Sequence, residues 1–313
     1  MQQLSQIGRR LKLRQLEILS AVADCGTMGK AAERLAISQP VISKAIADLE
    51  RMLGVRLFDR SAQGVEATAY GRTLLKWSVA VFDDLRQGMR EIEFLSDPTT
   101  GHLRVGCGGA MIEGILPVIL IRLRRRHPRL TFEVTQANTG DVLYRELRER
   151  NVDLIMGRTG TRDLEDDLNA ENLFDEPLFV VAGRCNPWAH RRRVKLADLI
   201  DEPWILPRSE VARATIAETF AACGLQVPRA EVICSSIHMH SALLAEGRFL
   251  AMRPASVLRF GAKDRSIKVL PIKLPALPRP VGVITLKDKM ISPVAQGFIE
   301  CARDASKSML ANR

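Results

Sequence analysis

The chain has 313 residues, of which 46% are hydrophobic and 26% are charged, and its formal net charge is +10. A chain of this length holds about two or three domains, and the composition is typical of folded proteins rather than disordered ones. No apolar run approaches the ~20 residues of a membrane span, and the N-terminus has no apolar signal core, so we expect a cytoplasmic protein without membrane contact.

Positive charge is concentrated near the N-terminus. Residues 1–76 contain 12 Lys and Arg against 7 Asp and Glu, a net charge of +5, which is half of the total. Such an excess favours contact with phosphates and therefore with nucleic acid. The 6 cysteines form no CxxC pair, so we expect reduced thiols.

A first helix is predicted from Leu11 to Cys25, where Gly26 stops it. The stretch 28–50 then predicts a helix, a tight turn and a second helix, with a helix-turn-helix at about 28–47. Ser38 is a good N-cap residue, and Pro40 is favoured in a first helical turn. The positions expected to face the core are Ala31, Ala32, Leu35, Ile37, Val41, Ala45, Ile46 and Leu49.

The outer face of the second helix carries Gln39, Ser43, Lys44 and Asp48. This layout is typical of a helix-turn-helix whose second helix enters a DNA major groove. The spacing alone leaves an alternative, an ordinary pair of helices with a polar outer face.

A short hairpin is predicted next, with strands over 55–58 and 65–68 and a turn over 59–64. Such a hairpin is typical of the wing that accompanies some helix-turn-helix domains. Arg60 at its base could reach phosphate or the minor groove.

Three motifs in this region resemble the winged helix-turn-helix of LysR-type transcriptional regulators. They are Ala31-Ala32-Glu33-Arg34-Leu35 with Ser38-Gln39-Pro40-Val41-Ile42-Ser43, then Phe58-Asp59-Arg60, then Ala67-Thr68-Ala69-Tyr70-Gly71. The matches fall in order over residues 11–70. The resemblance implies an all-α winged helix-turn-helix DNA-binding domain over residues 11–68, with double-stranded promoter or operator DNA as its partner.

The resemblance also implies which side chains approach DNA. The expected set is Thr27, Lys30, Arg34, Ser38, Gln39, Pro40, Ser43, Lys44 and Arg60. Many family members have Arg at the position of Lys44. Because Lys lacks the planar bidentate fork that reads guanine, we expect weaker sequence readout at that position.

A long helix is predicted over 69–96, capped by Thr68. Its apolar stripe comprises Leu75, Phe82, Leu85, Met89 and Ile92, interrupted by Ser78. The helix would span about 40 Å, more than a small winged domain covers, so a second copy of the same helix is the economical partner. Packing on its own domain is the alternative. LysR-type regulators dimerise through this helix, which implies a homodimer or homotetramer. Residues 97–101 are expected to form a hinge.

Beyond the hinge, strands alternate with helices, which predicts an α/β fold with mostly parallel sheets. The region 102–313 resembles the family's effector-binding domain, two lobes like those of type 2 periplasmic binding proteins. Lobe I is expected at about 102–168 and 277–313, and lobe II at about 169–276. Strands are expected at 103–107, 131–136, 153–156, 178–182, 204–206, 231–234, 249–252, 267–270 and 281–286, and helices near 111–126, 140–149, 212–223, 238–246 and 292–311.

In such lobes a ligand lies at the C-terminal ends of strands, against helix N-termini. Arg208, which follows a strand, could pair with an anion. The expected effector-binding set is Gly109, Ala110, Asn138, Thr139, Arg208, Ser209, His238 and Arg253. Each has a structural alternative: turn geometry explains the glycines, and His238 could simply begin a helix. The family more often has Ser or Thr where this chain has Gly109 and Ala110.

Other functions find less support in the sequence. The chain contains no HExxH, GxSxG or phosphate-loop motif and no clustered carboxylate pair, so we expect no catalytic residue, metal or cofactor. A cysteine redox switch at Cys185 would need a resolving partner that the sequence does not place nearby. The runs Arg124–Arg126 and Arg191–Arg193 are either solvated faces or contacts to bent DNA or a partner.

The sequence therefore predicts a LysR-type transcriptional regulator that senses a small-molecule effector, with RNA polymerase as a further candidate partner. The alternative is a solute-binding or enzymatic α/β protein without DNA function. Residues 175–178, 201–207 and 279–282 look most like the subgroup that regulates sugar-binding-protein or aromatic-acid genes.

Overall fold

The computed structural model describes residues 11–61, 64–137, 139–160, 165–261 and 266–310. The chain divides into two compact units, Met1–Gly88 and Met89–Arg313. The division falls inside helix α5 (Ala69–Ser96), whereas the sequence placed domain boundaries at the two ends of that helix. The reason is local packing, because Leu74 and Leu75 of α5 join the core of the first unit.

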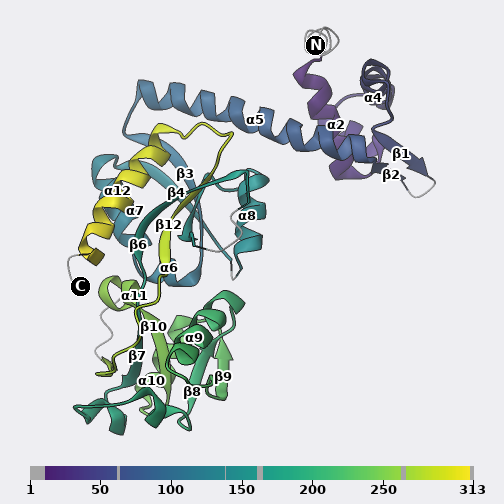
Figure 1. Cartoon of the computed structure of the whole chain (residues 1–313). Helices are drawn as coiled ribbons and strands as arrows, with labels where there is room; N and C mark the ends of the chain where they lie inside the picture. The colour runs from purple at the N-terminus through teal and green to yellow at the C-terminus, as the bar shows by residue number, and fades with distance from the viewer. Residues whose placement is uncertain (1–10, 62–63, 138, 161–164, 262–265, 311–313) are drawn as a thin grey trace. The chain divides into compact units, whose positions relative to one another are not determined.

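The described part of the first unit contains a group of helices, a hairpin and most of α5 (Figure 1). Besides α5, these are α2 (Leu13–Cys25), α3 (Met28–Leu35), α4 (Gln39–Leu53), β1 (Phe58–Ser61) and β2 (Gly64–Ala67). The hairpin is antiparallel, with Phe58 opposite Ala67. Ile42, Ile46 and Leu49 of α4 are fully buried against α2 and α3. The prediction that Val41 faces the core is wrong, since Val41 is 49% exposed and Ile42 takes the inward position.

Local signals explain where these helices begin and end. Gly26 ends α2 in the left-handed conformation (φ 68°), which glycine adopts without strain. Thr27 caps α3, because its Oγ1 accepts a hydrogen bond from the Lys30 amide at 3.2 Å. Ser38 holds the N-cap position of α4, although its side chain makes no capping bond within the described chain. Thr68 caps α5 by accepting from the Gly71 amide at 3.1 Å.

The second unit is built on two five-stranded sheets, each with helices on its faces (Figure 1). The strands are β3 (Thr100–Cys107), β4 (Arg129–Gln136), β5 (Leu154–Arg158), β6 (Leu168–Asp175), β7 (Leu178–Gly183), β8 (Trp204–Pro207), β9 (Ala230–Cys234), β10 (Leu250–Pro254), β11 (Ile267–Val269) and β12 (Pro280–Leu286). The helices are α6 (Gly109–Glu113), α7 (Leu116–Arg126), α8 (Gly140–Arg148), η1 (Pro187–His190), η2 (Leu196–Leu199), α9 (Glu210–Ala222), α10 (Ile237–Ala245), α11 (Ala255–Phe260) and α12 (Pro293–Leu310).

Lobe I is the sheet of order β4-β3-β5-β12-β6 with its helices, and lobe II is the sheet of order β11-β7-β10-β8-β9 with its helices. Both sheets are mixed. β3 is parallel to β4 and β5, whereas β12 is antiparallel to β5 and β6. β8 is parallel to β9 and β10, whereas β7 is antiparallel to β10 and β11. The expectation of mostly parallel sheets is therefore wrong.

The two lobes are joined by two neighbouring chain crossings. β6 extends the lobe I sheet as far as Asp175, so the outward crossing comes at Glu176 and Pro177, later than the expected boundary at 168. The return crossing reaches β12 through Arg279. The Glu176 amide donates to the Arg279 carbonyl at 2.9 Å, which ties the two crossings together.

Each sheet has an apolar core on both faces. On lobe I, one core contains Phe298 of α12 and Ile119 of α7, and the other contains Leu143 and Leu147 of α8. On lobe II, Phe220 of α9 packs edge-on against Trp204 at 5.5 Å between ring centroids. The predicted helix over 111–126 is split into α6 and α7, and the sequence did not predict β6 or α11. None of the helices in the described part of the chain has the length and apolar character needed to cross a membrane.

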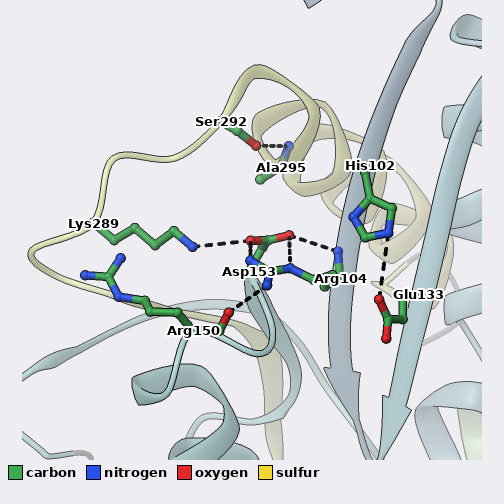
Figure 2. Close-up of polar contacts among 8 residues, drawn as sticks. All are labelled: His102, Arg104, Glu133, Arg150, Asp153, Lys289, Ser292 and Ala295. Carbon is green, nitrogen blue, oxygen red and sulfur yellow. Dashed lines mark hydrogen bonds and ion pairs between the residues drawn. The ribbon is translucent and has the colours of Figure 1, made fainter. Parts of the chain in front are cut away.

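A buried ion-pair cluster holds the start of β5 against β3 (Figure 2). The Asp153 carboxylate accepts from the Arg104 guanidinium at 2.7 Å and from the Arg104 amide at 2.9 Å. Lys289 Nζ lies 3.2 Å from the same carboxylate, and Arg104 also donates to the Arg150 carbonyl. Burial alone would raise the pKa of Asp153, but these hydrogen bonds and charges outweigh it and hold the pKa at about 2.

Candidate DNA interface and interlobe cavity

The first turns of α4 present a polar, exposed face. Gln39, Pro40 and Lys44 are exposed and Ser43 is half-buried, while Ile42 and Ile46 anchor the opposite face in the core. Pro40 lies within the first turn, where its missing N–H removes no helical bond. An amide, a hydroxyl and an ammonium group on one exposed helical face can donate to base edges and to phosphates.

The remaining residues predicted to contact DNA surround α4 in different ways. Lys30 is exposed, and Thr27 is half-buried with its hydroxyl used in capping α3. Arg60 is exposed on β1, opposite Val65 of β2. Arg34 forms an ion pair with Asp24 at 2.9 Å, and this hydrogen bond is the main reason that its pKa is raised. Any phosphate contact by Arg34 must therefore compete with Asp24.

A cavity of about 260 Å³ lies between the two lobes of the second unit. Residues from both lobes line it, at the C-terminal ends of β3, β5, β8 and β10. Six of the predicted effector-binding residues line this cavity: Gly109, Ala110, Thr139, Arg208, Ser209 and Arg253. Asn138 lies outside the described residues.

His238 does not belong to the cavity lining, in contrast to the prediction. It is exposed on the first turn of α10. His240 lines the cavity instead, because it points to the buried side of the same turn. Burial lowers the pKa of His240, and its ring contacts the Cys234 carbonyl at 3.4 Å. His240 is therefore neutral at neutral pH.

Charged side chains from both lobes meet at this cavity. Arg253 is buried and donates to Ser241 Oγ at 2.9 Å. Glu176 is also buried and accepts from the Ser256 amide at 2.9 Å and the Ser256 hydroxyl at 2.7 Å. Burial raises the pKa of Glu176, partly offset by these hydrogen bonds.

Sequence patterns did not indicate Arg158, Glu176 and His240 as lining residues. Arg158 ends β5, the same strand-end position that led to the choice of Arg208 and Arg253. The signal was therefore available, but the predicted strand stopped at Met156. Glu176 could not be found in this way, because it lies in a crossing that the predicted lobe boundaries misplaced.

No cluster of three or more His, Cys, Asp or Glu side chains among the described residues could hold a metal ion. All six cysteines are free, and burial raises the pKa of Cys107 to about 12, which makes that thiol unreactive.

Comparisons with known proteins extend over most of the chain. Residues 96–307 match the family model described as the LysR substrate binding domain, and residues 13–72 match that of the bacterial regulatory helix-turn-helix protein, lysR family. The HTH-type transcriptional regulator GbpR of Azospirillum brasilense is 29% identical over 304 residues, covering 96% of this chain and 88% of GbpR. The HTH-type transcriptional regulator GalR of Pseudomonas putida is 28% identical over 291 residues, covering 93% of this chain and 73% of GalR.

Solved structures give the same result. Full-length CbnR complexed with its target DNA is 26% identical with a TM-score of 0.56, covering 95% of this chain and 100% of CbnR. A full-length OxyR variant from Pseudomonas aeruginosa has a TM-score of 0.64 at 23% identity, covering 95% of each chain, and this likeness concerns the fold.

Proposed function

Because this chain belongs to the LysR family of bacterial transcriptional regulators, we propose that the exposed face of α4 reads its operator and that the interlobe cavity binds its effector. The chain is a sequence-specific DNA-binding regulator with a C-terminal domain that senses a small molecule. Membership in this family places it among regulators rather than among the solute-binding or enzymatic alternatives.

The observation that carries the DNA proposal is the exposure of Gln39 and Lys44 on a helix whose other face is locked in the core. In a major groove, Gln39 pairs with adenine N6 and N7, while Lys44 reaches guanine or phosphate as a point charge. Pro40 and Ser43 lie on the same face. Thr27, Lys30, Arg34 and Ser38 approach phosphates, and Arg60 of the wing approaches the minor groove.

A gel-shift assay with salt titration tests this proposal, using a duplex selected in vitro from a random pool. Gln39→Ala with Lys44→Ala should remove sequence preference, and Lys44→Ala alone should reduce the salt slope by about 0.9 per subunit. Arg51→Ala is the matched control, because Arg51 is exposed on the last turn of α4 and pairs with Asp48. Equal losses in the Lys44 and Arg51 variants would contradict a role for this face.

The effector proposal rests on the six predicted residues that line one cavity between the lobes. A ligand there contacts lobe I through Gly109, Ala110 and Thr139, and lobe II through Arg208, Ser209 and Arg253. Binding then changes how the lobes pack across subunits, which alters the spacing of the DNA-binding domains and the DNA bend. A ligand that raises Tm and changes the bend of bound DNA supports this mechanism, and raised Tm without any effect on DNA contradicts it.

We further propose that α5 joins two copies of the chain. Its exposed apolar side chains include Leu85, Met89, Ile92 and Leu95, from 46% to 79% exposed in the single chain. A second α5 covers them in a homodimer, and two dimers assemble into a homotetramer. Promoter binding requires the compartment that holds DNA, so we place the protein in the cytoplasm. We include RNA polymerase as a candidate partner at the promoter.

A further inference from the structure

We propose that the effector is a small organic acid with an apolar body, and that Arg158 holds its acidic group. This inference rests on the proposed effector role of the interlobe cavity. Arg158 is the last residue of β5 and lies opposite Val281 of β12 in the lobe I sheet. Ile155, Gly157, Arg158 and Val281 all line the cavity, so the end of this strand pair forms part of its wall.

Arg158 is a half-buried cation that lacks a bonded counter-ion. Its side chain makes no hydrogen bond or ion pair with another described residue. Burial lowers the pKa of Arg158, because its cation is partly removed from water. The charges of Glu176, Glu218 and Asp175 oppose this effect. A cation held away from water is costly unless an anion accompanies it. An anionic ligand would supply that partner.

The carboxylate of Glu176, which lines the cavity, is already hydrogen-bonded to another part of the chain. Glu176 accepts both the amide and the hydroxyl of Ser256, which begin the α11 turn. Its charge acts on Arg158, but no hydrogen bond joins the two described side chains. Glu176 therefore leaves the N–H donors of the Arg158 guanidinium available to a ligand anion.

Lobe II contributes a second accessible cation. Arg208 is exposed and lines the same cavity, and its side chain makes no hydrogen bond or ion pair within the described chain. Its backbone amide bonds the Cys234 carbonyl at 3.2 Å, which fixes the backbone of Arg208 at the end of β8. Cations from opposite lobes therefore line one cavity. An acid that contacts both links the lobes directly.

The other lining groups favour an apolar body over a neutral sugar. Leu143, Tyr144 and Ile155 of lobe I and Ile216 and Ile237 of lobe II contribute apolar surface to the cavity. Several hydroxyls in the wall are engaged by the protein: those of Thr139 and Ser209 accept from helix amides, and that of Thr215 donates to the Val211 carbonyl. This apolar surface offers no partner to the hydroxyls of a polyhydroxylated ligand, and unpaired hydroxyls are costly to bury.

The size of the cavity restricts the ligand further. A volume of about 260 Å³ lies below the range of roughly 300–1,000 Å³ that accommodates drug-sized molecules. The cavity therefore fits a single ring or a short chain that carries one or two acidic groups. Carboxylate and phosphate share the chemistry that Arg158 recognises, and the experiment distinguishes them.

Thermal-shift titrations of the full chain with matched neutral and acidic probes test the inference. The probes are benzoate and benzamide, hexanoate and hexanamide, galactonate and galactose, and phenyl phosphate. We expect benzoate, hexanoate or phenyl phosphate to raise Tm while the neutral probes do not, and phenyl phosphate separates phosphate from carboxylate recognition. A response to galactonate alone would overturn the apolar body. Arg158→Gln should weaken binding of the acid that raises Tm at least 10-fold, and Arg158→Lys should restore part of it. Arg192→Gln, an exposed cation of lobe II, is the matched control and should bind normally.

The ligand-free variant separates a binding role from a structural one. Because Arg158 lacks a bonded partner, Arg158→Gln should leave the Tm of the free protein unchanged or slightly higher, and a clear decrease would overturn the inference. It is also overturned if no acid raises Tm, if a neutral probe matches its acid, or if Arg158→Gln binds the acid normally. An Ala110→Trp variant, which fills the cavity, separates the two proposals. If galactose binds and Ala110→Trp abolishes that binding, the proposal of an acidic effector is overturned but the effector role of the cavity stands. If an acid binds and Ala110→Trp does not abolish that binding, the effector role of the cavity is overturned as well.

Discussion

Replacing Asp153 by asparagine should destabilise lobe I by about 3 kcal/mol. The Asp153 carboxylate contacts the Arg104 guanidinium at 2.7 Å and Lys289 Nζ at 3.2 Å, and the three side chains are 11%, 16% and 6% exposed (Figure 2). Its pKa falls from 3.8 to about 2, and a shift of this size corresponds to roughly 2.5 kcal/mol. Removing one member of a buried ion pair typically costs about 3–5 kcal/mol, since the cations lose their partner. The free energy from the pKa shift is therefore close to the lower end of this range.

Urea denaturation at neutral pH measures this loss, with Asp304→Asn as the control. Asp304 pairs with Lys307 on the surface, so its substitution should leave the midpoint unchanged. The pH dependence gives a second readout. Because the folded pKa of Asp153 lies below its ordinary value, its contribution is complete above about pH 5 and is lost as pH falls towards 2. Asp153→Asn should flatten the stability curve in that window. If Asp153→Asn changes neither the urea midpoint nor the slope of stability against pH below about 5, the reasoning is refuted.

Three further predictions concern the DNA-binding unit and α5. Val41 is 49% exposed on α4, so we expect it to contact a thymine methyl. Val41→Ser should therefore weaken operator binding by roughly 3- to 10-fold. Replacing that thymine by uracil should cause no further loss of binding in the Val41→Ser variant. Ile92 is 66% exposed, so Ile92→Asp should produce monomers in sedimentation experiments, whereas the exposed control Glu93→Gln stays assembled. A Cβ on Gly71 would lie 2.1 Å from the Leu57 carbonyl, so Gly71→Ala should cost about 1–3 kcal/mol in urea. Gly88→Ala, with open space at its Cβ on the same helix, should not destabilise.

The sequence predicted the helices of the DNA-binding unit because their signals are local, whereas the first strand of the hairpin, expected over 55–58, lies at Phe58–Ser61. Capping by Thr27, the left-handed Gly26 and the proline in the first turn of α4 each depend on a few neighbouring residues. The error at Val41 has a simple origin. Val41 and Ile42 are adjacent apolar residues, and helical periodicity alone does not decide which of two such neighbours faces the core.

The errors in the second unit arise from contacts that are distant in sequence. β6 was missed because it is a lobe I edge strand whose polar residues, such as Asn169 and Asn172, hide the strand pattern, and only its pairing with β12 defines it. The helix over 111–126 divides at Gly114, where a Cβ would approach Ser256 Oγ at 2.7 Å. Nothing near Gly114 in the sequence indicates that Ser256 lies against it. Arg158 was missed because the predicted strand stopped at Met156, whereas pairing with β12 extends β5 to Arg158.

The position of Arg158 suggests how an acid could act on the whole effector-binding domain. Arg158 pairs with Val281 of β12, whose neighbour Pro280 pairs with Asp175 of β6, so Arg158 lies beside both chain crossings between the lobes. A ligand shifts an equilibrium between two lobe arrangements only if it binds one of them more tightly. An acid held by Arg158 alone interacts with lobe I in either arrangement and shifts little. An acid long enough to reach Arg208 as well favours the arrangement that brings the two cations within its span. Length, rather than affinity, should therefore separate acids that induce a response from acids that only occupy the cavity.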